Sequence, residues 1–115
     1  MSKSIRYVRR GVQGRVRQNF NLPGIIKSRQ AVVHVTAGEI TPANPSRVLG
    51  GAEQDFKYNL GDADIWVSNV SPHFNDHFEG EPGGVEFILH VNWPNPLDVG
   101  ITITVEEETP FEIQN

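Results

Sequence analysis

The chain has 115 residues, a formal net charge of −4 and no cysteine. This length predicts a single domain with a modest core, and the lack of cysteine excludes a disulfide framework and thiolate chemistry. No apolar run approaches the roughly 18–20 residues that a membrane span needs, and no apolar stretch follows the N-terminal cations. We therefore expect neither a membrane segment nor a secretory signal, which favours a cytoplasmic location.

Charge is segregated along the sequence. Residues 1–38 hold eight arginines or lysines and no acid, whereas residues 39–115 hold two cations and 14 acids. The formal charges of the two parts are therefore +8 and −12. Such asymmetry between the parts of a chain is typical of a tail that binds a partner.

The first 29 residues show no clean hydrophobic period. Glycines and a proline interrupt any helix longer than about two turns. We predict that residues 1–29 form an extended basic N-terminal arm, with a short strand at 5–8 and a turn at 21–24. Residues 30–115 are predicted to form the folded body.

Short strands are predicted throughout the body, because its apolar residues alternate and no stretch of ten or more residues has the helical period. They cover residues 31–36, 55–60, 64–70, 85–93 and 99–108, with 111–113 as a further short one. We expect 55–60 and 64–70 to form a hairpin, and 37–53 and 71–84 to be long loops. The expected inward residues of the two clearest strands are Val85, Phe87, Leu89, Val91, Trp93, Val99, Ile101, Ile103 and Val105. The predicted fold is an all-β antiparallel β-sandwich, jelly-roll or Greek-key like.

The loop at 71–84 contains the best candidates for a metal site. His73, Asp76 and His77 offer imidazole and carboxylate ligands. A loop gives the spacing of the two histidines no geometric meaning, so we favour a polar loop and predict no metal and no cofactor. Phe74 and Phe78 of the same loop are candidates to contact a ligand or a partner.

No catalytic motif is present, neither a nucleophile elbow nor a zinc-protease or phosphate-binding pattern. Asp62 and Asp64 lack the further ligands of a calcium loop and indicate a tight turn. We therefore predict a protein that is not an enzyme. An alternative is a ligand- or carbohydrate-binding module that uses Trp66, Trp93, His90 and the loop at 71–84, although packing in the core is the favoured role of Trp93.

Three kinds of partner suit the basic arm. Single-stranded nucleic acid fits arginine and aromatic side chains, but the acidic body would repel a polyanion. An anionic membrane attracts cations, but the arm has no helical apolar stripe, so no membrane partner is expected. A protein partner fits best, because an extended arm of about 24 residues reaches up to ~80 Å and crosses a neighbouring domain. Its predicted contact residues are Arg6, Tyr7, Arg9, Arg10, Arg15, Arg17 and Phe20.

A small β-sandwich with a long basic arm is similar in architecture to virion structural proteins, namely jelly-roll coat, cement or decoration subunits. The similarity covers the general layout and no residue string, so no site residue carries over. From the segregated charge and the reach of the arm, we predict a non-enzymatic assembly protein that exchanges its arm between copies of a homo-oligomer, for example a trimer. The similarity implies an acidic protein assembly such as a capsid shell as partner, and a location in a virion or in the cytoplasm.

Overall fold

The computed structural model describes the chain in four stretches, residues 2–42, 56–76, 78–106 and 112–114. These residues form seven strands and no helix. The strands are β1 (Lys3–Val12), β2 (Gly14–Asn21), β3 (Val33–Pro42), β4 (Phe56–Tyr58), β5 (Asp64–His73), β6 (Gly84–Asn92) and β7 (Leu97–Val105). The described part of the chain accordingly has no helix of the length and apolarity needed to cross a membrane.

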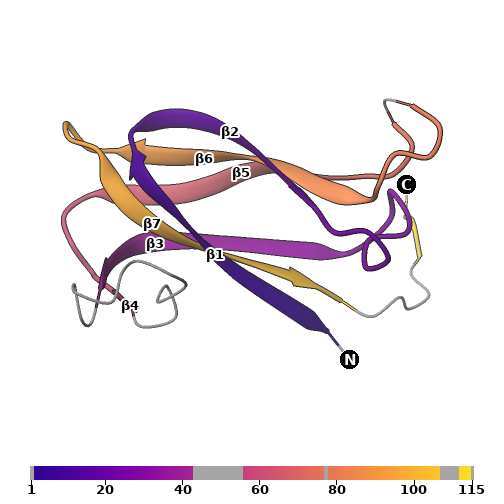
Figure 1. The fold of residues 1–115 in the computed structure, drawn as a ribbon, viewed down its shortest axis with the longest axis horizontal. Coiled ribbons are helices and arrows are strands. Elements are labelled where there is room, and N and C mark those ends of the chain that lie inside the picture. The colour runs from indigo at the N-terminus through magenta and orange to yellow at the C-terminus, as the bar shows by residue number, and fades with distance from the viewer. Residues whose placement is uncertain (1, 43–55, 77, 107–111, 115) are drawn as a thin grey trace.

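The strands form two antiparallel sheets, with the orders β1-β7-β3-β4 and β2-β6-β5. Figure 1 shows them as two layers, and β1 crosses in front of β3 and β7. The prediction of an all-β fold with antiparallel sheets is confirmed, and the arrangement is β-sandwich-like. The jelly-roll layout is not confirmed: a jelly roll takes eight strands in two Greek keys, and the described residues form seven.

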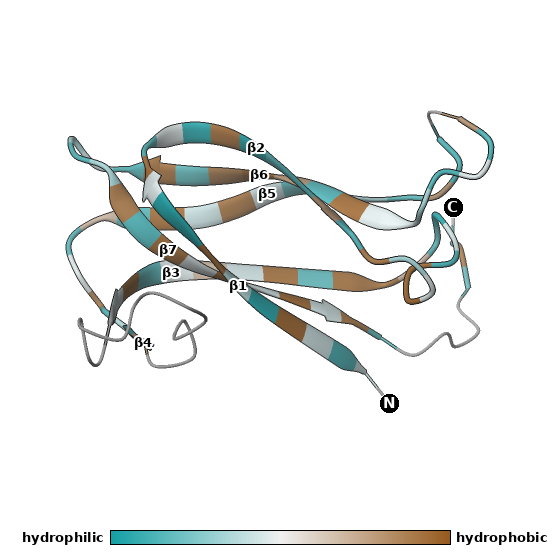
Figure 2. Cartoon of the chain, in the orientation of Figure 1, coloured by the Kyte–Doolittle hydropathy of each residue, from teal (hydrophilic) through white to brown (hydrophobic). Residues whose placement is uncertain are grey.

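The core lies between the sheets and is built mainly by β6 and β7. Every second residue of these strands turns inward, and the colours of β7 alternate accordingly in Figure 2. The inward residues are at most 6% exposed, as predicted: Val85, Phe87, Leu89, Val91, Val99, Ile101, Ile103 and Val105. Trp93, the last residue of the predicted face, follows the end of β6 and packs against the same core while half-buried.

The N-terminal segment differs from the prediction, because it does not form an extended arm. β1 pairs along its length with β7, and β2 pairs along its length with β6. Gly11 and Gly14 adopt φ angles of 63° and 77°, which glycine reaches without steric cost. These two glycines let the backbone leave one sheet and enter the other, so the residues that break a helix here serve as a corner between strands.

The predicted hairpin of 55–60 and 64–70 is also wrong. β4 pairs with β3, where Ile40 faces Tyr58, and β5 pairs with β6, where Trp66 faces His90. β3 continues to Pro42 and so occupies the start of the predicted loop at 37–53, most of which lies outside the described residues. Residues 112–114 form no strand, and Phe111 lies outside the described residues.

Candidate functional site

β1 and β2 are end strands of their sheets, and only Gln13 separates them. Their partners β7 and β6 are likewise consecutive in the chain, so β1 and β2 lie on the same side of the two layers. We call this side the arginine edge. Its arginines are those that the sequence predicted as contact residues: Arg6, Arg9, Arg10, Arg15 and Arg17.

Three of these arginines are held by neighbours in the same chain. Arg6 donates from Nε to Oγ1 of Thr102 at 2.8 Å, and its guanidinium carbon lies 5.5 Å from the centre of the Tyr58 ring. Arg10 lies 3.9 Å from Asp98. Arg17 donates from Nε and Nη2 to the same oxygen of Glu86.

The other two arginines, Arg9 and Arg15, are exposed and form no ion pair with any described residue. Arg9 lies near the hydroxyl of Tyr7 and partly opposes the rise in its pKa. Arg15 faces His90 across β2 and β6. The arginine edge therefore keeps two charges available for an outside partner.

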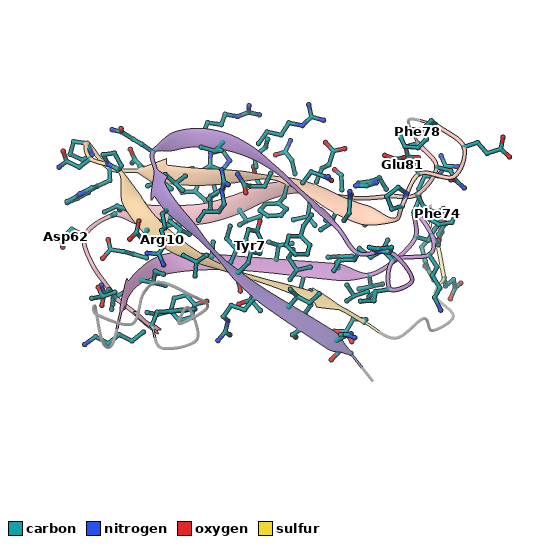
Figure 3. All side chains as sticks on the ribbon, in the orientation of Figure 1. Tyr7, Arg10, Asp62, Phe74, Phe78 and Glu81 are labelled. Carbon is teal, nitrogen blue, oxygen red and sulfur yellow. The ribbon has the colours of Figure 1, made fainter. Side chains whose placement is uncertain are left out.

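The two aromatic residues predicted as contacts, Tyr7 and Phe20, lie inside the fold instead. Their rings pack at a centroid distance of 4.8 Å, and both side chains pack against the core. Figure 3 shows Tyr7 turned toward the space between the layers. Burial raises the pKa of Tyr7 to about 12, with Arg9 opposing the rise. These rings join β1 to β2 and close the side of the core.

A second polar surface covers the outer face of the β2-β6-β5 sheet. Trp66 of β5 stacks on His90 of β6, with ring centres 4.5 Å apart and an angle of 4° between the planes. Oγ of Ser68 lies 2.7 Å from Nε2 of His90. Of the residues proposed for carbohydrate binding, the structure therefore joins Trp66 and His90, whereas Trp93 packs against the core.

The Ser68–His90 pair has the distance of a nucleophile and its general base. A catalytic triad also needs a third group that orients the other imidazole nitrogen. Within the described residues, Nδ1 of His90 has no hydrogen-bond partner. We therefore assign the Ser68 contact to holding the imidazole against Trp66.

The candidate metal ligands are directed to different partners. His73 is 4% exposed, and its Nε2 lies 2.7 Å from Oδ1 of Asn19. An amide oxygen only accepts, so this nitrogen is the donor. Its Nδ1 lies 3.6 Å from Glu81. Asp76 pairs instead with Arg29 at 3.3 Å, and His77 lies outside the described residues.

The described residues contain no group of three metal-ligating side chains. His73 and Glu81 instead line a shallow depression of about 390 Å³. The other lining residues are Arg17, Gln18, Asn19 and Glu86. The depression lies on the same sheet face as the Trp66–His90 stack, because Glu86 precedes His90 by four residues along β6.

Of the two loop phenylalanines, Phe78 is exposed and Phe74 is half-buried. Figure 3 shows both at one end of the molecule with Glu81, whereas Asp62 lies at the opposite end. Glu81 fixes the loop, because its Oε2 accepts from the amide of Asp76 at 2.9 Å. The sequence gives no signal for this role.

Sequence reasoning also missed Ser68 and Asn19. Ser68 carries a usable signal, since the two-residue period of β5 places it on the same face as Trp66. Asn19 reaches His73 of β5 only because β2 joins the sheet that β5 and β6 form. Comparisons of the chain with protein-family models, curated proteins and solved structures gave no match.

Proposed function

We propose that this chain is a non-enzymatic assembly protein whose arginine edge binds the acidic surface of a neighbouring copy. The observation that carries the proposal is the position of the arginines. They lie on two end strands on one side of the molecule, and Arg9 and Arg15 remain without an ion pair among the described residues. The contact replaces the exchanged arm that the sequence predicted.

The charge of the rest of the chain supports a partner of the same kind. Residues 39–115 carry a formal charge of −12. Asp62 and Asp64 are exposed in the turn before β5 and at its start, and no described residue forms an ion pair with them. Guanidinium groups suit such carboxylates because they bind them through two parallel hydrogen bonds.

Edge-to-edge pairing of two copies is disfavoured by the same charges. Cations on an open end strand repel an identical strand and protect it from pairing. The arginine edge of one copy is therefore directed to an acidic region of the next. Because each exposed ion pair contributes roughly 0.2–1 kcal/mol, several contacts together give a salt-sensitive association.

A larger acidic shell would offer the same chemistry. The proposal extends to decoration of such a shell, with the capsid of a virion as the assembly that the layout of the sequence resembles. The oligomer formed by the chain alone is the simpler test, because it needs no second component.

The experiment is sedimentation velocity of the full chain at about 0.01 M and about 0.15 M salt, where the Debye length falls from ~30 to ~8 Å. We expect a species larger than the monomer at low salt that dissociates as salt rises. The variant Arg9→Glu/Arg15→Glu should remain monomeric. The control variant Lys27→Glu/Lys57→Glu makes the same change in net charge at two exposed lysines away from the edge and should still associate.

A wild-type chain that sediments as a monomer at both salt concentrations contradicts the proposal. Equal association of the two double variants also contradicts it, because the effect would then follow net charge rather than the position of the arginines.

A further inference from the structure

We propose that the exposed ring of Trp66 is the stacking platform of a binding site for a neutral oligosaccharide. The site lies on the outer face of the β2-β6-β5 sheet. Its recognition element is the ring of Trp66, which the assembly contact proposed above does not use, although Arg15 and Asp64 of that contact lie beside it.

The ring of Trp66 has one covered face and one open face. His90 covers the first face in the parallel stack. β5 is an end strand of its sheet, so no further strand of that sheet covers the second face. Trp66 is accordingly 46% exposed, although it lies within a regular strand. An open indole face of this kind packs well on the apolar C–H face of a sugar ring.

The platform is fixed before any ligand arrives. Ser68 holds the imidazole of His90 at 2.7 Å, and His90 in turn supports the indole. A ring that is already ordered loses less conformational entropy on binding than a free side chain. The stack therefore favours the weak, stacking-based recognition that a neutral ligand allows.

Hydrogen-bonding groups flank the ring on the same face. Asp64 precedes Trp66 by two residues, which places both on one side of β5. Asn92 faces Asp64 across β5 and β6, and both residues are exposed. A carboxylate accepts hydrogen bonds, and an amide both donates and accepts them. An apolar plane beside these groups matches a sugar ring with hydroxyls at its rim.

The charges around the stack select a neutral ligand. Asp64 lies on one side of the stack, and Arg15 faces His90 on the other. The carboxylate of Asp64 would repel a polyanion, and the guanidinium of Arg15 would repel a cation. A quaternary ammonium ion is typically held by a cage of several aromatic faces, whereas the ring contact of Trp66 within the described residues is to His90.

The test is isothermal titration calorimetry with cellohexaose, xylohexaose and mannohexaose as probes. Heat is preferred to fluorescence because the chain has two tryptophans and the key variant removes one. We expect at least one probe to bind the wild-type chain. Trp66→Ala should lower its affinity at least tenfold, and Trp66→Phe should lower it less. Trp93→Phe, which changes the core-packed indole, should bind as the wild type does.

Three results would overturn the inference: no binding of any probe, equal affinity of Trp66→Ala and the wild type, or choline binding that depends on Trp66 without oligosaccharide binding. If circular dichroism shows that Trp66→Ala does not fold, the test uses Trp66→Phe and Asp64→Ala instead. Wild-type affinity in both of these variants would overturn the inference. The variant Arg9→Glu changes an assembly residue on β1, in the other sheet. It should keep the oligosaccharide affinity, so the two proposals fail separately.

Discussion

The ring of Tyr58 lies against the backbone of Gly38: a Cβ atom at this glycine would be 3.0 Å from Cδ1 of the ring. Gly38 faces Gly100 across β3 and β7, and a Cβ atom at Gly100 would lie 3.1 Å from the Tyr58 hydroxyl. Because neither glycine has a side chain, the backbone of the four-stranded sheet is open on its outer face at this place, and the Tyr58 ring lies over it. An aromatic ring over strand glycines replaces the packing that their missing side chains cannot supply.

This contact predicts that Gly38→Ala lowers the stability of the wild-type chain but raises the stability of a chain that lacks the Tyr58 ring. Gly38→Ala should destabilise the wild-type chain by about 1 kcal/mol, because the ring must move from a well-packed position. In a Tyr58→Ala background the same change should stabilise the chain by about 0.5 kcal/mol, since alanine suits a strand interior better than glycine does. Urea unfolding of the four proteins gives both values. A destabilisation of the same size in both backgrounds would show that the ring is not the cause.

Tyr7 predicts a loss of stability at alkaline pH. Its pKa is raised from 10.0 to about 12 by burial, against the opposing charge of Arg9. Below pH 10 both states hold the proton, but between pH 10 and 12 the unfolded chain releases it first, so the free energy of unfolding falls as pH rises. Tyr7→Phe should remove this part of the decline. The check is the difference in urea midpoint between wild type and variant across this range.

At neutral pH the same variant should unfold close to the wild-type midpoint. The hydroxyl of Tyr7 is 3.4 Å from Oε1 of Gln18, which is long for a hydrogen bond between two oxygen atoms. A midpoint difference that stays constant from pH 8 to pH 12 would contradict the assignment of the shifted titration to Tyr7.

Gly83 lies where the link after β2 meets the loop before β6. Its carbonyl accepts from the amide of Leu22 at 2.7 Å, and a Cβ atom here would lie 1.8 Å from the carbonyl oxygen of Ile26. Gly83→Ala therefore forces two backbones apart, and we expect a loss of at least about 3 kcal/mol. Gly80→Ala is the matched control, because the space around Gly80 is open and only its φ of 86° is strained.

Gly80→Ala should lower the free energy of unfolding by only about 1–2 kcal/mol, the usual penalty for a side chain in the left-handed region. Thermal unfolding monitored by circular dichroism compares the two. Equal effects of both substitutions would mean that the loop and the link do not approach each other as closely as described.

The position of Glu81 predicts that loss of its carboxylate opens the loop between β5 and β6 locally. It is 8% exposed, and its carboxylate accepts from the amide of Asp76. Glu81→Ala should increase the rate of hydrogen exchange at that amide and destabilise the chain by about 1–3 kcal/mol, because the partly buried amide of Asp76 loses its acceptor. Glu79→Ala, at an exposed position of the same loop, should leave exchange at Asp76 unchanged. Equal exchange rates in the two variants would exclude this role of Glu81.

The inward faces of β6 and β7 were predictable because apolar residues recur at every second position of both strands, with Ile88 as an additional outward apolar residue of β6. Each carries apolar residues at every inward position, so the period alone identifies the face that is buried. The N-terminal strands carry the same signal in weaker form. Ile5 and Tyr7 alternate with Arg6, and Val16 alternates with Arg15 and Arg17. On an end strand arginines are tolerated, so the charge that suggested a free arm is compatible with a sheet.

The pairing of strands could not be predicted in the same way. Neighbours in a sheet depend on the path of the whole chain, and local turn signals between 55–60 and 64–70 suggested a hairpin that does not form. The contact of His73 with Asn19 has the same origin, because it joins two strands that are distant in sequence. The stack of Trp66 on His90 likewise follows from register, which sequence periodicity leaves open.

The pairing of β1 with β7 sets the order of events during synthesis. Lys3 faces Val105, so β1 leaves the ribosome long before β7, the strand that pairs with its backbone groups. Contacts this distant in sequence slow folding and prolong the time in which a nascent chain can aggregate. Arginines along a strand that is still unpaired act as gatekeeper residues, which oppose aggregation. Their like charges disfavour pairing between unfinished chains before β7 has been translated.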